Sequence, residues 1–159
     1  MDILTADDGD LPEILELQRL AFRENALRYE DPDIPPLRQT LEELTEEARH
    51  NVTLKAVIDE KIVGIARGRM EGGVCHISKV VVHPDHWNKG IGKRLVVAVE
   101  DVFNAPVYEL VTGHMDKKNI SLYEKLGYEI CDDPLVKITH SLFFIHMRKQ
   151  KHKDQDPSV

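Results

Sequence analysis

The first fifty residues carry apolar side chains at helical spacing, interrupted by a proline-rich segment. The first apolar stripe is formed by Leu11, Ile14, Leu15 and Phe22. It predicts a helix over residues 11–28, with Asp10 as its N-cap and Glu13 completing a capping box. The prolines of residues 31–36 end this helix, because proline lacks an amide donor and disfavours helix in the residue before it. A second amphipathic helix is predicted from the stripe of Leu37, Leu41, Leu44 and Ala48.

From residue 52 the apolar pattern changes to that of β-strands. A short strand at residues 3–5 opens the chain, and three further strands are predicted at 52–58, 62–70 and 74–82. Only short polar or glycine-containing turns separate the last three strands. We therefore expect them to form an antiparallel meander.

A strand, a long helix and another strand then follow one another along the chain. The helix is predicted from Ile91 to Val102 by its apolar spacing, and Pro106 ends it. This order indicates a crossover connection, and hence a parallel pair between the strands at 74–82 and 107–112. A short helix at 117–126 and closing strands at 128–131 and 142–148 complete the expected elements.

The size and composition are those of one ordinary globular domain. The chain has 159 residues, of which 42% are hydrophobic and 31% charged. We expect a single domain over residues 1–149 and a disordered tail over 150–159, where no apolar pattern continues. The net charge of -7 argues against a nucleic-acid-binding protein and against an anionic membrane as partner.

The remaining composition favours a cytoplasmic protein without a structural metal. Cys75 and Cys131 lie in separate apolar segments, so we expect both to be reduced thiols of the core. The acidic N-terminus does not resemble a signal peptide, and no apolar run reaches the length of a membrane span. The eight histidines are scattered without metal-ligand spacing, so no metal site is expected.

The segment after the strand at 74–82 is the most informative about chemistry. His83-Pro84 and the glycine loop Asn88-Lys89-Gly90-Ile91-Gly92 lead directly into a helix. Free amides at a helix start and the helix dipole bind anions, and glycine lets a phosphate approach the backbone. Three cations stand in or beside this loop: Lys89, Lys93 and Arg94. A capped surface helix with solvated lysines is the alternative. The loop is neither a P-loop nor a dinucleotide fingerprint, because the required lysine, hydroxyl and third-glycine positions are not met.

Two successive motifs along the chain resemble those of the GNAT superfamily of acetyl-CoA-dependent N-acetyltransferases. The first joins Val82-His83-Pro84 to Gly90-Ile91-Gly92 at the family's spacing. The second runs from Ile120 through Leu122-Tyr123 and Leu126-Gly127 to Tyr128. The resemblance covers most of the chain. It implies an α/β layered fold, with a mixed, mostly antiparallel central sheet of about seven strands flanked by about four helices.

The resemblance also implies where acetyl-CoA, the expected acetyl donor, would bind. The pantetheine arm would lie along the strand edge like an added strand, and the phosphates would contact the glycine loop. The implied cofactor-binding residues are Val80, Val81, Val82, Asn88, Lys89, Gly90, Ile91, Gly92, Lys93, Arg94 and Asn119. Trp87 replaces the family's Gln or Arg before the loop, and Asp116 stands where the family often has Asn. Asn119 is the residue that could take over that contact.

The implied reaction is direct attack of an amine on the thioester, with coenzyme A leaving as a thiolate. Tyr123 matches the family tyrosine that protonates the thiolate, and a core aromatic is the alternative interpretation. The proton of the amine could pass to Glu71, His76 or a water, and none of these is assigned. The acceptor groove is expected around Phe22, Tyr29, Glu30, Asp31 and the acidic second helix.

The expected function is therefore transfer of an acetyl group to a primary amine of a small molecule or protein. A non-catalytic acyl-CoA-binding sensor is the second hypothesis, and a plain interaction domain is the third. The acceptor stays unidentified, and the sequence leaves open whether the protein forms a homodimer.

Overall fold

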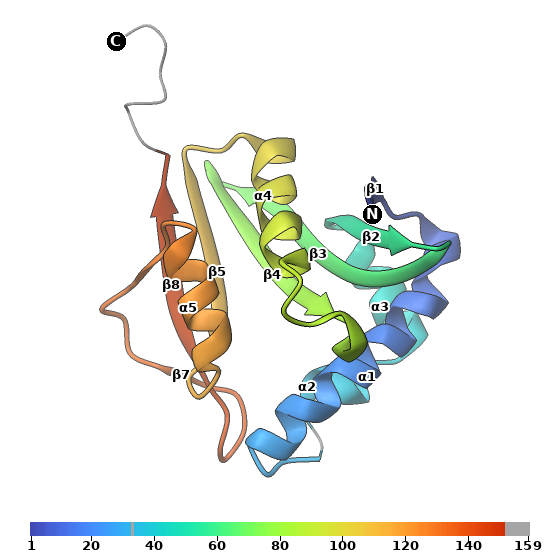
Figure 1. The fold of residues 1–159 in the computed structure, drawn as a ribbon. Coiled ribbons are helices and arrows are strands. Elements are labelled where there is room, and N and C mark those ends of the chain that lie inside the picture. Colours follow the sequence, from blue (N-terminus) through green and yellow to red (C-terminus); the bar gives the residue numbers. More distant parts are fainter. Residues whose placement is uncertain (33, 152–159) are drawn as a thin grey trace, which may run out of the picture.

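A computed structural model of the chain describes residues 1–32 and 34–151, and these residues form one eight-stranded sheet with helices on both faces (Figure 1). The helices are α1 (Leu11–Arg28), α2 (Pro35–Arg38), α3 (Leu41–Ala48), α4 (Ile91–Phe103) and α5 (Lys117–Lys125). The longer strands are β1 (Asp2–Thr5), β2 (Val52–Ile58), β3 (Lys61–Glu71), β4 (Val74–Val82), β5 (Val107–Gly113) and β8 (Phe143–Gln150). Strands β6 (Glu129–Ile130) and β7 (Val136–Lys137) are short and both pair with β8.

The sheet confirms the expected meander and the expected parallel pair. Its order is β1-β2-β3-β4-β5-β8-β6, and the β4–β5 pair is parallel while the other pairs are antiparallel. The parallel ladder runs only from Val74↔Val107 to Ile77↔Leu110. Beyond this point the two strands separate, and Figure 1 shows the V-shaped opening between them. The central sheet is thus divided into a β1–β4 half and a β5–β8 half.

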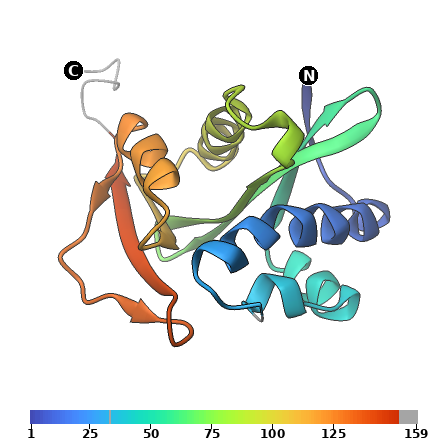
Figure 2. The ribbon, with the colours of Figure 1, turned by 60° about the horizontal axis from the view of Figure 1, so that its bottom comes forward.

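Two layers of helices cover the sheet from opposite sides (Figure 2). Helices α4 and α5 lie on one face, where the main core is centred on Leu95, Val99 and Tyr108. Helices α1, α2 and α3 lie on the other face, where Ile14 and Leu44 pack against Ile65 of β3. Both layers meet the sheet beside the opening between β4 and β5.

The first helices follow the predicted bounds more closely than the predicted caps. Helix α1 spans residues 11–28 as expected, but the side chain of Asp10 makes no cap hydrogen bond to it. The Asp10 carboxylate instead accepts hydrogen bonds from the Lys55 ammonium and the Asp7 amide, because a 3₁₀ turn precedes the helix. The predicted second helix is broken at Gln39, and α3 begins after it with a capping box between Thr40 and Glu43.

The strand count and the chain end also differ slightly from expectation. The described residues contain eight strands and five α-helices, because the short β7 pairs with β8 and the second helix is split. Strand β8 continues to Gln150, which pairs with Val107. The other predicted tail residues, from 152 on, lie outside the described part of the chain. Cys75 is buried, Cys131 is half-buried, and both are free thiols. In the described residues no helix is long and apolar enough to span a membrane.

Candidate active site

A cleft of about 720 Å³ lies at the opening between β4 and β5. It is bounded by the end of β4, the loop and first turn of α4, the start of α5 and the second half of α1. Nine of the residues predicted to bind a cofactor line it: Val80, Val81, Val82, Asn88, Gly90, Ile91, Gly92, Lys93 and Asn119. One cavity therefore brings together the strand, the glycine loop and α5.

The start of α4 is shaped to leave backbone amides available. Gly90 precedes the helix with φ +77°, a left-handed conformation that glycine adopts without steric cost. In the described residues, no side chain makes a cap hydrogen bond to this helix start. The first-turn amides and the positive end of the helix dipole therefore face the cleft, as at other anion sites. Gly92 lines the same wall, where a Cβ would meet Leu122 Cδ2 at 3.6 Å.

The cations around this cleft differ from the three that the loop suggested. Among the residues described, Lys93 lines the cleft, whereas Lys89 and Arg94 do not. Three lysines of α5 line it instead, namely Lys117, Lys118 and Lys125. Their charges were not predicted as part of the site, because α5 begins 25 residues after Gly92 and no local pattern relates the two. Only the fold places both helices on one face of the sheet.

Trp87 occupies the position of the family's Gln or Arg and has a structural task here. Its indole N–H donates a 2.7 Å hydrogen bond to the carbonyl of Val82. This bond joins the glycine loop to the last residue of β4. The substitution therefore replaces a polar side chain with one that fixes the strand end.

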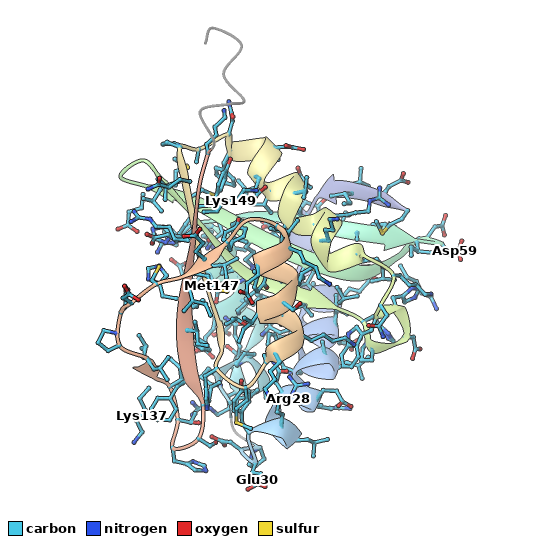
Figure 3. All side chains as sticks on the ribbon, turned by 60° about the vertical axis from the view of Figure 1, so that its left-hand side comes forward. Arg28, Glu30, Asp59, Lys137, Met147 and Lys149 are labelled. Carbon is cyan, nitrogen blue, oxygen red and sulfur yellow. The ribbon has the colours of Figure 1, made fainter. Side chains whose placement is uncertain are left out.

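Asp116 and Asn119 share the start of α5. Asp116 is 6% exposed, and its carboxylate accepts hydrogen bonds from the Asn119 amide and from Asn119 Nδ2, the latter at 2.8 Å. Arg28 of α1 lies 3.4 Å from the same carboxylate, and Figure 3 shows Arg28 below the start of this helix. Burial raises the pKa of Asp116, although Asn119 and Arg28 work against the shift. Both Asp116 and Asn119 line the cleft, so this end of the cavity presents a carboxylate and an amide side by side.

Tyr123 lies at the edge of this arrangement and not on the cleft wall. Its side chain is 4% exposed and its ring packs against Tyr128 at 6.1 Å between centroids. The described cleft lining includes its neighbours Ser121 and Leu122 but not Tyr123 itself. Burial first, and the nearby Asp116 second, raise the pKa of Tyr123 above its ordinary value. Its hydroxyl is therefore protonated at neutral pH, as a general acid requires.

On the face of the sheet opposite α4 and α5, side chains of β3, β4, β5, β8 and the loop after β6 form a row of alternating acids and imidazoles. His76 stands between Glu71 at 3.9 Å and Glu109 at 3.8 Å. Glu109 also lies 3.2 Å from His146 Nε2, and His146 Nδ1 lies 2.8 Å from Asp133. His76 and Glu109 are paired one step before the parallel ladder ends. Sequence reasoning weighed only Glu71 and His76 from this row. The alternating pattern of β5 and β8 was the signal that could have added the others.

Cys131 joins the far end of this row. One ligand-type atom from each of Cys131, Asp133 and His146 lies within 4.8 Å of the others. Burial raises the pKa of the Cys131 thiol, and the hydrogen bond to Asp133 raises the pKa of His146. Both pKa shifts therefore oppose the loss of a proton from this cluster.

The expected acceptor residues are only partly brought together. Phe22 lines the cleft, accompanied by Ala21, Asn25 and Arg28, which the sequence did not single out. Tyr29 is buried, and its hydroxyl accepts a hydrogen bond from the Met115 amide. Glu30 and Asp31 line a different hollow beside α1. The second half of α1 therefore contributes more to the cleft than the loop after it.

Comparisons with known proteins agree with this arrangement. The family described as "Acetyltransferase (GNAT) family" matches residues 11–128. A curated protein, glucosamine 6-phosphate N-acetyltransferase of Schizosaccharomyces pombe, is 40% identical over 57 residues, which cover 35% of this chain and 50% of that protein. The chain thus spans about half the length of this relative.

Solved structures match over nearly the whole chain. The PaiA N-acetyltransferase of Thermoplasma acidophilum, in complex with coenzyme A, superposes with a TM-score of 0.76 at 18% identity, covering 95% of this chain and 100% of that one. YncA of Salmonella typhimurium, a putative acetyltransferase solved with acetyl-CoA, gives 0.71 at 22% identity, covering 98% and 96%. The ribosomal-protein-alanine N-acetyltransferase of Brucella melitensis gives 0.75 at 21% identity, covering 95% and 100%. These identities are low, and the likeness is one of fold.

Proposed function

Because the chain belongs to the acetyltransferase (GNAT) family, we propose that it transfers an acetyl group from acetyl-CoA to a primary amine by direct attack. The observation that carries this proposal is the uncapped, glycine-led start of α4 at the mouth of the opening between β4 and β5. Phosphates fit the start of α4, and an extended pantetheine arm fits the opening between β4 and β5. Related folds solved with coenzyme A or acetyl-CoA support the same donor.

Each wall of the cleft has a part in the proposed reaction. The first-turn amides of α4 hold the pyrophosphate, with Lys93 and the lysines of α5 nearby. Val80 to Val82 supply backbone groups along the arm, and an amide of β4 polarises the thioester carbonyl. The amine then attacks the carbonyl carbon, and the thiolate leaves with a proton from Tyr123.

The attacking amine must reach the thioester as a neutral base, so its ammonium proton needs an acceptor. The row of acids and imidazoles on the opposite face begins beside the same strand opening. His76 is the imidazole of this row on β4 and is paired one step before the parallel ladder ends, with two carboxylates within 4 Å, so it is the proposed proton acceptor. The carboxylates on this face favour a cationic amine as acceptor over an anionic substrate.

A non-catalytic acyl-CoA-binding protein is a second candidate, favoured by the absence of Tyr123 from the described cleft wall. Both candidates bind the cofactor, but only an enzyme releases free thiol when an amine is added. The test is a panel of small amines and peptides incubated with acetyl-CoA, with thiol release and acetylated product both measured. We expect at least one amine to give matching amounts of both. Tight acetyl-CoA binding with no acceptor-dependent release across the panel would favour the sensor.

A further inference from the structure

Strand β4 contains a bulge at a residue that is poorly suited to it. Arg67 of β3 pairs with Ser78, and Ile65 pairs with Val81, so two β4 residues face Ala66 alone. The first of these two residues is Lys79, with φ +48°. Glycine or asparagine tolerates this left-handed conformation best, and a long side chain pays for it in backbone strain. A lysine kept in this conformation points to a task for its ammonium group.

The Lys79 ammonium belongs to a buried polar network centred on Glu47 of α3. It lies 3.0 Å from Glu47 Oε1 and donates a 2.6 Å hydrogen bond to Gln39 Oε1. Arg67 Nη1 donates to the same Glu47 carboxylate. Gln18 of α1 donates to Gln39 Oε1 at 2.9 Å and to the carbonyl of Pro36. The network therefore ties α1, the α2–α3 connection and β3 to the bulge of β4.

Burying this network costs desolvation free energy, so its presence calls for an explanation other than stability. Arg67 and Gln18 are fully buried, and two cations share the single carboxylate of Glu47. In the described residues, Nε and Nη2 of Arg67 and Oε1 of Gln18 find no hydrogen-bond partner. Buried ionic groups of this kind contribute little net stability compared with apolar side chains. They do fix the relative positions of the segments that carry them, because the charged groups are satisfied in only one arrangement.

The bulge lies between the end of the parallel ladder and the part of β4 that lines the cleft. Lys79 comes two residues after Ile77, the last β4 residue of the parallel ladder, and Val80 already lines the cleft. The other end of the network reaches the same cleft through α1. Gln18 precedes Ala21 and Phe22 by three and four residues, so all three lie on one side of that helix.

We propose that Glu47 and Lys79 are positioning residues, whose ion pair holds the β4 bulge and the cleft-facing side of α1 in the arrangement needed for acetyl transfer. The proposal rests on the proposed function and concerns two residues that do not line the cleft. Glu47 and Lys79 act through the backbone of the bulge and through Gln39 and Gln18. The amides of Lys79 and Val80 would then be set toward the thioester carbonyl.

Two variants separate this role from ordinary stabilisation. Glu47→Gln keeps the size of the side chain and removes the charge that pairs with both cations. Glu46→Gln is its matched control, since Glu46 is the adjacent residue of α3 and, within the described part of the chain, pairs with exposed Arg49 and His50. Lys79→Gly removes the ammonium and also relieves the left-handed strain, so this variant should fold at least as readily as one with a side chain there.

The first measurement is steady-state turnover per folded molecule. Glu47→Gln and Lys79→Gly should each lower kcat by roughly 10- to 100-fold, the scale of a small misplacement, with little change in KM for acetyl-CoA. The double variant should be no worse than either single one, because the two residues act as a unit. Glu46→Gln should behave like the parent. Parental kcat in folded Lys79→Gly, or additive losses in the double variant, would overturn the proposal.

The second measurement needs no acceptor amine and so remains decisive if the proposed function fails. Amide NMR shifts of Lys79 and Val80 are compared between the coenzyme A and acetyl-CoA complexes, which differ only in the acetyl group. In the parent, at least one of these amides should shift between the two complexes, and Glu47→Gln should abolish the difference while binding persists. No difference in the parent, or an unchanged one in Glu47→Gln, would overturn the positioning role. A parent that shows the difference but acetylates no amine would contradict the proposed function alone.

Discussion

The two sides of strand β4 are built in different ways. Beside the cleft, the end of the strand and the start of α4 come from one continuous segment, and backbone amides supply much of the chemistry. On the other face, Glu47 comes from α3, His76 and Lys79 from β4, and Glu109 from β5, and their charged side chains meet across these segments. The first region depends on local conformation and the second on long-range packing. The donor side should therefore be sensitive to glycine replacements, and the other side to changes of charge.

The largest effect should come from Gly92→Glu on the donor side. A Cβ at this position would touch Leu122, Val82 and Val80 only at ordinary contact distances, so the fold should persist. The carboxylate, however, would place a negative charge at the phosphate site. Thermal stabilisation by acetyl-CoA should disappear in this variant. It should survive in Gly92→Ala, which adds only the Cβ. An undiminished shift in Gly92→Glu would place the cofactor elsewhere.

The next effect concerns Tyr123, which connects the core to the donor side. If its hydroxyl protonates the thiolate, Tyr123→Phe should lower turnover by roughly 10² while acetyl-CoA binding hardly changes. Turnover must be normalised to folded, cofactor-binding protein across a range of pH. Near-parental turnover throughout would remove Tyr123 from the mechanism.

Tyr128→Phe provides the matched control for Tyr123. The Tyr128 hydroxyl donates a 2.7 Å hydrogen bond to Glu100 within the same core. Its loss should lower the free energy of unfolding by about 1 kcal/mol, or somewhat more because the acceptor is charged, and leave turnover per folded molecule unchanged.

A smaller effect should distinguish the cations around the cleft. Lys93→Gln should weaken coenzyme A binding by up to about fivefold, corresponding to roughly 1 kcal/mol for an exposed charge. Lys61→Gln, at the start of β3, is the control. Dephospho-coenzyme A should bind more weakly than coenzyme A, and added salt should reduce this difference in affinity. Equal affinities for the two ligands in the parent would show that no cation contacts the 3′-phosphate.

The smallest effect should appear on the opposite face, as a pH dependence of stability. The hydrogen bond to Asp133 raises the pKa of His146, so the folded state holds this proton more tightly than the unfolded state does. The stabilisation should be complete below the ordinary histidine value of about 6.5 and be lost as the pH rises through the raised folded value. Melting temperatures of the parent and of His146→Gln should therefore converge with increasing pH. A constant difference would rule out this linkage.

The same contrast explains what the sequence could and could not predict. The meander, the crossover and the glycine loop were predictable, because periodicity and glycine placement act over a few residues. The break at Gln39 was not, since its side chain is engaged by Gln18 and Lys79 from distant segments. Likewise, Glu47 belongs to an acidic helix face that looks solvated, and only the fold reveals Arg67 beneath it. Local patterns located the donor side, whereas side-chain partners required the tertiary structure.

The opening between β4 and β5 also affects the stability of the folded protein. Each strand keeps a free edge in the middle of the sheet, although free edges usually lie at the periphery, where they are short or guarded by charge. A ligand that pairs with these edges joins the two halves of the sheet and adds its binding free energy to their cohesion. At a hundred times its dissociation constant, such a ligand would stabilise the folded chain by about 2.7 kcal/mol. The resistance of the protein to unfolding, and to strand pairing between chains, would then increase with the concentration of acyl-CoA.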